Sequence, residues 1–273
     1  MITFPNCKIN LGLNIVNRRP DGYHDLETVF YPVPLTDVLE IVPARGDDST
    51  LTCSGNPVDC PVEKNLVMRA CRLMQRHYGV PQVDVFLHKL IPDGAGLGGG
   101  SSDASHAMLM LRDMFDVDAT LEQLAALAAT LGADCPFFIH NRPMMATGIG
   151  DKLAAVDLSL SGYTLLLVKP PVSVPTRVAY SRVTPRPSGQ DLPQLLRRPV
   201  PQWQGVVKND FEPSVFEAFP ELAVVKRRLL EAGAVYAAMS GSGSSIYGLF
   251  DDVKVAERMR GDFAGCGEFV IAL

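Results

Sequence analysis

The residue pattern best suited to chemistry is a glycine-rich run at residues 92–102, which has the sequence PDGAGLGGGSS. Five glycines fall within residues 94–100, and they remove side chains where another molecule must approach the backbone closely. An alternating strand pattern precedes the run and an amphipathic helix pattern follows it. The first N–H groups of such a helix and the positive end of its dipole can face an anion. We expect Ser101, Ser102 or Asp103 to cap the helix. The segment therefore predicts a phosphate-binding loop.

Two better-known phosphate loops fit this run less well. Gly94, Gly96 and Gly99 match the G-x-G-x-x-G expression, but the acidic residue expected about 20 residues later would fall in a predicted helix that starts at Leu121. A Walker loop requires a lysine after the glycines, and none follows here. A flexible connector is the remaining alternative. It is disfavoured because a strongly amphipathic helix follows directly.

Two charged residues outside the run could take part in phosphoryl transfer. Asp134 follows a predicted helix end and precedes the residues CPF, which suggest a poorly solvated site where a carboxylate could accept a hydroxyl proton. It could equally be the N-cap of a following helix. Lys8 lies in a strand pattern of apolar and small polar residues, where an ammonium group is costly without an anion. An outward-facing lysine on an edge strand is the alternative.

Two turns offer further contacts. Tyr23 and His24 follow the tight turn RRPDG at residues 18–22, and an exposed aromatic pair can stack on a base and hydrogen-bond its edge. A packed tyrosine beside a surface histidine is the alternative. Residues 239–244, MSGSGS, form a second glycine–serine turn that could donate N–H groups to phosphate, or they form a plain hairpin turn.

The elements that must position these residues mix strands and helices without a regular βαβ repeat. Strands are expected at residues 9–15, 38–43, 83–87, 246–250 and 269–273. Helices are expected at residues 65–78, 104–115, 121–131, 220–232 and 253–263, with Gly132 as a left-handed cap of the third. A stretch rich in Pro, Arg and Ser at residues 170–201 separates two differently organised halves. We therefore predict an α+β protein of two lobes rather than a doubly wound sheet.

Composition restricts partners and compartment. The 273 residues carry 25 Lys and Arg against 30 Asp and Glu, a net charge of −5 that disfavours nucleic acid. There is no long apolar run for a membrane and no signal-peptide pattern at the N-terminus. The six cysteines form no CxxC pair and have no histidine at zinc-site spacing, which favours a reducing compartment without a zinc site. We expect a cytoplasmic protein with no nucleic-acid or membrane partner.

The glycine-rich run, written P-x-x-x-GLGGGSS, resembles the ATP-binding motif of the GHMP kinases (galacto-, homoserine, mevalonate and phosphomevalonate kinases). Four other parts of the chain match in the family's order, from near residue 5 to near residue 250: KINL at 8–11 with RPDGYH at 19–24, LGADCPFF at 131–138, KNDFEP at 208–213 and MSGSGS at 239–244. The resemblance implies a ribosomal-S5-like lobe at residues 1–155 and a ferredoxin-like lobe at 156–273, with the last strand as a candidate to return to the first lobe. The element PDGYH narrows it to a branch that phosphorylates the 2-hydroxyl of a cytidine diphosphate-linked methylerythritol in non-mevalonate isoprenoid biosynthesis.

The resemblance also implies roles for single residues. Lys8 and Asp134 would be catalytic, with the carboxylate handling the hydroxyl proton and the ammonium cancelling charge on the phosphoryl group. Tyr23 and His24 would recognise the cytosine, Asn10 the erythritol end, and Thr176 the acceptor more generally. ATP, the co-substrate, would be held by Pro92, Asp93, Gly94, Ala95, Gly96, Leu97, Gly98, Gly99, Gly100, Ser101 and Ser102, with Asn65 and Lys89 beside the adenine.

Two departures from the family pattern and three rival interpretations remain. Asn6-Cys7 stands where the family more often has Pro-Ala, and His106 replaces a small residue. We expect Mg²⁺ to come with ATP, because no carboxylate cluster would hold it independently. The rivals are another GHMP kinase such as a homoserine or mevalonate kinase, a non-catalytic nucleotide sensor, and a nucleic-acid module built on the S5-like lobe.

Overall fold

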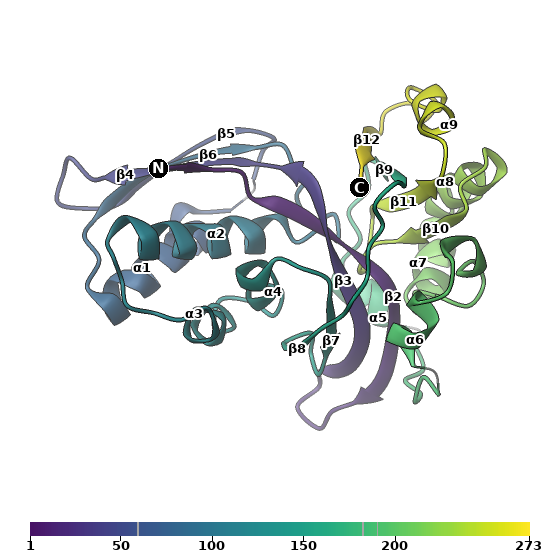
Figure 1. Ribbon diagram of the computed structural model, residues 1–273, viewed down its shortest axis with the longest axis horizontal. Coiled ribbons are helices and arrows are strands. Elements are labelled where there is room, and N and C mark those ends of the chain that lie inside the picture. Colours follow the sequence, from purple (N-terminus) through teal and green to yellow (C-terminus); the bar gives the residue numbers. More distant parts are fainter. Residues whose placement is uncertain (59, 182, 190) are drawn as a thin grey trace. The chain divides into compact units, whose positions relative to one another are not determined.

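The computed structural model describes residues 1–273 except Asp59, Arg182 and Gln190 (Figure 1). The chain forms two compact units that are discontinuous in sequence. The first unit comprises Met1–Cys7, Leu35–Asp93 and Gly98–Arg142, and the second comprises Lys8–Pro34, Gly94–Leu97 and Pro143–Leu273. The last crossing between them, after Arg142, lies shortly before the boundary predicted at residue 155.

The first unit is a four-stranded sheet covered by helices. The strand order is β1 (Ile2–Thr3), β4 (Val38–Pro43), β6 (Val83–Lys89) and β5 (Thr50–Gly55), and only the β5–β6 pair is parallel. Figure 1 shows the two longest helices of this unit along one face of the sheet. The helical elements are η1 (Val62–Lys64), α1 (Leu66–Tyr78), α2 (Gly99–Met114), α3 (Leu121–Ala128) and α4 (Cys135–His140).

The alternation of buried and exposed side chains in β6 explains why the helices pack on one face of the sheet. Val83, Val85 and Leu87 are buried, whereas Phe86 and His88 point to solvent. The buried set packs against apolar side chains of α1 and α2 in one core. A sheet with one face packed and the other solvated has this period of two.

The second unit contains one whole sheet and most of another, because the outer ends of two strands of the latter, residues 6–7 and 35–36, belong to the first unit. One has the order β2 (Asn6–Arg18), β3 (His24–Thr36), β7 (Met144–Thr147) and β8 (Lys152–Ala155), and the other has the order β10 (Tyr236–Met239), β11 (Ile246–Phe250), β9 (Thr164–Lys169) and β12 (Gly267–Ala272). In Figure 1, α8 lies against β10 and β11, where its apolar stripe is buried. The other helical elements of this unit are α5 (Thr176–Tyr180), α6 (Leu192–Leu196), η2 (Val200–Gln202), α7 (Glu212–Ala218), α8 (Pro220–Glu231) and α9 (Val253–Arg258).

The mixture of sheets and helices confirms the predicted α+β class, and strands β4 and β11 have the predicted bounds. The suggestion that the last strand returns to the first lobe is wrong, because β12 pairs along its whole length with β9. Among the described residues, no helix is long and apolar enough to cross a membrane.

Three predicted helix ends are also wrong. Gly98 is the N-cap of α2 with φ 71°, so Ser101, Ser102 and Asp103 lie inside the helix instead of capping it. The helix α3 ends at Ala128, since a tight turn through Leu131 N and Ala128 O closes it before Gly132. The helix α9 stops at Arg258, because the carboxylate of Glu268 accepts the N–H groups of Gly261 and Phe263 and turns the chain away.

Candidate active site

The N-terminus of α2 gives the glycine-rich run its binding capacity. The first intrahelical bond runs from Ser102 N to Gly98 O at 2.9 Å, so the N–H groups of Gly99, Gly100 and Ser101 precede it. Such groups have no acceptor within their own helix and lie at the positive end of its dipole. Within the first unit, this helix end can hold an anion such as a phosphate.

The earlier part of the run, Gly94–Leu97, lies in the second unit against the other glycine–serine turn. Ser240 Oγ donates to Gly96 O at 2.8 Å, and Ser245 N donates to Ala95 O at 3.2 Å. Gly96 has φ +77°, and a Cβ atom on it would lie 2.1 Å from Ser240 O. Only glycine fits there, because both the backbone angle and the space exclude a side chain.

Asn209, which we did not single out from the sequence, holds that second turn. Its Nδ2 donates to the carbonyl oxygens of Met239 and Gly241, both at 2.8 Å, and its Oδ1 accepts from Phe211 N. Asn209 belongs to the KNDFEP segment, which carried part of the family resemblance. Residues 239–244 join β10 to β11 as a hairpin turn, and this turn supports the glycine run through the bonds above.

Lys8 is buried, with 4% of its surface exposed, so the outward-facing alternative is wrong. Its Nζ donates to Asn10 Oδ1 at 2.6 Å and lies 4.8 Å from the centre of the Phe30 ring. Asn10 Nδ2 donates in turn to Thr28 Oγ1 at 3.0 Å. The predicted substrate residue Asn10 is therefore also the residue that fixes the ammonium of Lys8.

Asp134 occupies the N-cap position of α4, but its side chain makes no capping hydrogen bond. Its neighbours lie beside α2: a Cβ atom on Gly132 would be 3.9 Å from Ser101 Oγ, and Ser105 Oγ donates to Cys135 O at 2.8 Å. Burial raises the pKa of Cys135 to about 11. The segment that carries Asp134 is thus packed against the N-terminal end of α2. Lys8 belongs to the other unit, and its pairing with Asp134 stays a prediction.

A cavity of about 230 Å³ in the first unit brings together four of the predicted nucleotide residues, Asn65, Lys89, Asp93 and Gly100. Asn65 caps α1 by accepting from Val67 N at 3.0 Å, which leaves its side-chain nitrogen as a donor. The cavity is also lined by Val58, Cys60, Lys64, Leu66, Leu87 and Asp103.

Two residues that line this cavity, Lys89 and Asp103, form a buried ion cluster with Asp37. Lys89 Nζ donates to Asp103 Oδ2 at 2.6 Å and also to Asp37 Oδ2. Asp37 Oδ1 accepts from the backbone N–H groups of Leu90 and Ile91 at 2.6 and 2.8 Å. Burial alone would lower the pKa of Lys89, but the two carboxylates outweigh it and raise that pKa. Burial raises the pKa of Asp103 to about 7, against the opposing effect of Lys89. We did not anticipate Asp37 from the sequence.

The predicted aromatic pair lies at the hairpin between β2 and β3, in the second unit. Tyr23 is 62% exposed. His24 stacks on Tyr180 with ring centres 4.6 Å apart, and burial together with Arg18 lowers its pKa. Tyr180 also meets Phe211 edge-on at 4.7 Å. Tyr180 was missed, although it is the lone aromatic residue of the stretch 170–201.

Three residues from the sequence analysis remain to be placed: Thr176, Ser102 and His106. Thr176 begins α5, and its side chain is outside the described part of the structure. Ser102 is buried, with Oγ 3.3 Å from His106 Nδ1, which also contacts Ser102 O at 2.9 Å; His106 therefore braces the first turn of α2. Among the described residues, no group of three or more His, Cys, Asp or Glu could hold a metal ion.

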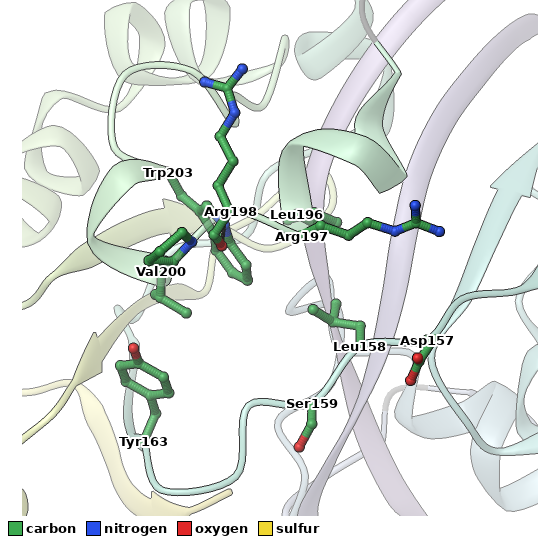
Figure 2. Close-up of a pocket in the computed structure, with 10 residues that line it drawn as sticks. Asp157, Leu158, Ser159, Tyr163, Leu196, Arg197, Arg198, Val200 and Trp203 are labelled. Carbon is green, nitrogen blue, oxygen red and sulfur yellow. Dashed lines mark hydrogen bonds between the residues drawn. The ribbon is translucent and has the colours of Figure 1, made fainter.

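A larger cavity, of about 420 Å³, lies in the second unit and contains none of the predicted site residues (Figure 2). Trp203, Leu196 and Val200 form its apolar part. Figure 2 shows the guanidinium groups of Arg197 and Arg198 pointing in different directions, away from a common point. The two guanidinium groups therefore do not meet at one ligand position.

Two family descriptions match the chain: the GHMP kinases N terminal domain at residues 65–142 and the GHMP kinases C terminal domain at residues 193–267. The chain is 52% identical over 251 residues to a 4-diphosphocytidyl-2-C-methyl-D-erythritol kinase of Parabacteroides distasonis, covering 92% of each, and 49% identical over 268 residues to that of Bacteroides fragilis, covering 97% and 98%. The crystal structure of a 4-(cytidine 5'-diphospho)-2C-methyl-D-erythritol kinase matches with TM-score 0.82 and 33% identity over all of both chains. A homoserine kinase from Cytophaga hutchinsonii matches with TM-score 0.69 at 18% identity, a likeness of fold alone. With its two-lobed fold, the chain belongs to the GHMP kinases and, within them, to the family of the 4-diphosphocytidyl-2-C-methyl-D-erythritol kinases.

Proposed function

We propose that this ATP-dependent kinase transfers the γ-phosphoryl group of ATP to the 2-hydroxyl of 4-diphosphocytidyl-2-C-methyl-D-erythritol, giving the 2-phosphate and ADP in non-mevalonate isoprenoid biosynthesis. The observation that carries the chemistry is the packing of the Asp134 segment against the first turn of α2. A carboxylate beside a phosphate-binding helix end is suited to accept a hydroxyl proton during phosphoryl transfer. The choice of acceptor rests on the names of relatives that are 52% and 49% identical.

The chain's own residues divide the work. The N–H groups at the start of α2 bind the phosphates and hold the terminal group in line with the hydroxyl. Asp134 takes the hydroxyl proton as the new P–O bond forms, and the bond to the β–γ bridging oxygen breaks to release ADP. Lys8, fixed by Asn10, offsets the negative charge on the transferring group.

Mg²⁺ belongs to the proposal as a companion of ATP. Hard cations prefer phosphate and carboxylate oxygens and keep several waters, so the triphosphate can be the main ligand. When bound, the ion neutralises phosphate charge. The buried hydroxyl of Ser102 faces His106 and is poorly placed as a ligand. Asp37 and Asp103 are buried and both bond the ammonium group of Lys89, so we assign no protein ligand.

The acceptor's cytosine is assigned to the cluster of Tyr23, His24 and Tyr180. The exposed ring of Tyr23 can stack on a base, while the stack of His24 on Tyr180 fixes the imidazole for a hydrogen bond to the base edge. Thr176 stays a proposed contact to the acceptor. We place the reaction in the cytoplasm, without a nucleic-acid or membrane partner, because all six cysteines are free and the net charge is −5.

A panel of acceptors tests the proposal. Purified protein with ATP and Mg²⁺ should convert the cytidyl compound to a product with one new phosphomonoester, seen by phosphorus NMR, and should release one ADP per product. Homoserine and mevalonate serve as controls. Phosphorylation of homoserine without the cytidyl compound would overturn the acceptor. ATP binding without turnover of any acceptor would support a nucleotide sensor instead.

A further inference from the structure

A chain of three buried hydrogen bonds leads from the side chain of Lys8 to a backbone carbonyl on the same strand. Lys8 Nζ donates to Asn10 Oδ1 at 2.6 Å, Asn10 Nδ2 donates to Thr28 Oγ1 at 3.0 Å, and the Thr28 hydroxyl donates to Gly12 O at 2.5 Å. Thr28 lies on β3, which neighbours β2, and none of its surface is exposed. All four residues belong to the second unit. The chain therefore connects a candidate catalytic group to the framework of one sheet.

The chemistry of its two ends fixes the direction of every bond in this chain. The ammonium group of Lys8 can only donate, so the atom of Asn10 that faces it must be the amide oxygen. The carbonyl oxygen of Gly12 can only accept, so the single hydroxyl proton of Thr28 must point toward it. The oxygen of Thr28 then has only lone pairs left for Asn10, and the atom that faces them must be the amide nitrogen. Both ends therefore require the same orientation of the Asn10 amide.

The opposite orientation of this amide would bring like groups together. The NH₂ group of Asn10 would face the ammonium of Lys8, where two donors would meet. The amide oxygen would face Thr28, whose hydroxyl proton would have to leave Gly12 O in order to bind it. Asn10 and Thr28 are both buried, so each lost bond would cost the desolvation of its polar group. The Thr28 hydroxyl thus selects the orientation that presents an oxygen to Lys8.

The backbone of Asn10 is held without the help of Thr28. Asn10 N donates to Ser240 Oγ at 3.3 Å, and Asn10 O accepts from the Tyr247 hydroxyl at 2.7 Å. Removal of the Thr28 hydroxyl would therefore leave Asn10 in place on β2 and free only its amide group to turn.

We propose that Thr28 is a positioning residue for phosphoryl transfer: its hydroxyl orients the amide of Asn10, and this amide directs the ammonium of Lys8. The inference rests on the proposed function, because it takes Lys8 as the group that offsets charge on the transferring phosphoryl. A charge of this kind lowers the barrier when its position is set before the reaction starts. Thr28 acts only through Asn10 and Lys8.

Two substitutions at position 28 separate the hydroxyl from the shape of the side chain. Thr28→Val keeps the volume and removes the hydroxyl, whereas Thr28→Ser keeps the hydroxyl. With the cytidyl acceptor, kcat should fall at least about tenfold in Thr28→Val and stay within about threefold of native in Thr28→Ser, while KM for ATP stays within about threefold in both. A kcat of Thr28→Val within about twofold of native would overturn the inference.

Thr164→Val is the matched control for the loss of a buried hydroxyl. Thr164 is 5% exposed and lies on β9, in the other sheet of the second unit. Its replacement should leave kcat within about twofold of native. A loss of kcat in Thr164→Val equal to that in Thr28→Val would show a general effect of the lost hydroxyl and contradict the inference.

A double-mutant cycle shows whether Thr28 acts through Asn10. In Asn10→Ala the chain of bonds is already cut, so the further change Thr28→Val should lower kcat by less than about twofold under single-turnover conditions. A merely structural role of Thr28 would lower kcat by the same factor in both backgrounds. That result would contradict the inference.

Nuclear magnetic resonance tests the orientation of the amide without any turnover. In protein labelled with ¹⁵N-asparagine, the side-chain signals of Asn10 are those that disappear in Asn10→Ala. The proton donated to Thr28 should move upfield in Thr28→Val and return in Thr28→Ser, because a hydrogen-bonded amide proton resonates downfield. A proton that does not move would overturn the inference. Absence of turnover in the unmodified protein would instead count against the proposed function, so the two failures are distinguishable.

Discussion

Asp134 occupies the N-cap position of α4, but its side chain makes no capping hydrogen bond. Its sequence context allows two roles, a helix cap and a proton acceptor, and these have different consequences. A cap would contribute about 1 kcal/mol to folding and leave the reaction unaffected. A proton acceptor would contribute to the rate and leave nucleotide binding unaffected. The missing capping bond favours the second role.

We therefore expect Asp134→Ala to lower kcat by at least about 10³-fold while the affinity for ATP changes by no more than a few-fold. The physical reason is that, in the proposed mechanism, the carboxylate acts on the acceptor's proton, whereas backbone amides of α2 bind the phosphates. Steady-state kinetics and calorimetric titration with ATP measure the two effects. Loss of ATP binding, or a variant that turns over normally but unfolds more easily, would return Asp134 to a structural role.

The raised pKa of Asp103 leads to a prediction for the pH dependence of the free energy of unfolding. Burial raises its pKa from 3.8 to about 7, in a cluster where Lys89, Asp37 and the thiol of Cys53 are the titratable groups in electrostatic contact with it. The native chain thus holds this proton more tightly than the unfolded chain does. The contribution of Asp103 to the free energy of unfolding is greatest at low pH and declines as the pH rises from about 4 to about 7.

Denaturant titration between about pH 4 and pH 8 measures this dependence, with Asp103→Asn, which lacks the titrating group, as the control. The same dependence on pH in both proteins would show that Asp103 does not cause it.

At the scale of elements, the glycine run shows how two glycines in one loop differ. Gly94 and Gly96 both have positive φ, +58° and +77°. A Cβ atom on Gly94 would have its nearest neighbour, Ser173 Oγ, at 4.0 Å, whereas a Cβ atom on Gly96 would lie 2.1 Å from Ser240 O. Gly94→Ala meets only backbone strain, but Gly96→Ala must also push apart the loop and the turn between β10 and β11.

Gly94→Ala should lower the free energy of unfolding by about 1–2 kcal/mol, the usual cost of a left-handed residue with a side chain. Gly96→Ala should cost at least about 2 kcal/mol more, because the displaced atom is backbone and cannot swing aside. Denaturant titration of both variants gives the comparison. Equal losses would mean that the turn does not hold the loop as the hydrogen bonds from Ser240 and Ser245 indicate.

The hairpin between β2 and β3 carries the prediction for the acceptor. Tyr23→Ala should raise KM for the cytidyl acceptor by about 5- to 100-fold, the range expected for loss of one base–aromatic stack, and leave KM for ATP unchanged. Tyr31→Ala is an unsuitable control, since the Tyr31 hydroxyl accepts from Leu160 N. Tyr78→Leu, in α1 of the first unit, is the better control. A rise in KM for ATP in Tyr23→Ala would contradict the assignment.

The elements also show what sequence can predict here. Strands β4 and β11 have the bounds predicted from the sequence. The family resemblance pointed to Asn65 and Lys89, which line one cavity with Gly100 of the glycine run, and their contact with a nucleotide stays a prediction. Helix ends were less predictable: at Gly98, the preference for Ser or Asp as a cap gave way to a left-handed glycine. The partners of Lys89, the contact of Asn209 with the second turn and the stack of Tyr180 on His24 depend on residues brought together by folding. A periodic pattern within one segment of the sequence cannot predict such contacts between distant residues.

At the scale of the whole molecule, the six free cysteines can report on both units through their reactivity with thiol reagents. Cys7, Cys71 and Cys135 are buried, whereas Cys53, Cys60 and Cys266 reach the surface. Burial raises the pKa of Cys53 and of Cys266, which lowers their reactivity as thiolates. Cys60 lines the cavity of about 230 Å³ in the first unit, together with Lys64 and Asn65, which is the cavity proposed for the nucleotide. A bound nucleotide would thus cover one accessible thiol of the first unit and leave Cys266 of the second unit uncovered.

We expect ATP to slow alkylation of Cys60 by iodoacetamide at least about tenfold at saturation, since the reagent then reacts only with the small unliganded fraction. Labelling of Cys266 should keep its rate and serves as the internal control. Peptide mass spectrometry after timed labelling measures both rates in one sample, and adenosine alone should protect Cys60 while inorganic triphosphate should not. Protection by triphosphate alone would place the phosphates, rather than the base, in the cavity of the first unit. In that case the nucleotide would have to bind in the opposite orientation along α2.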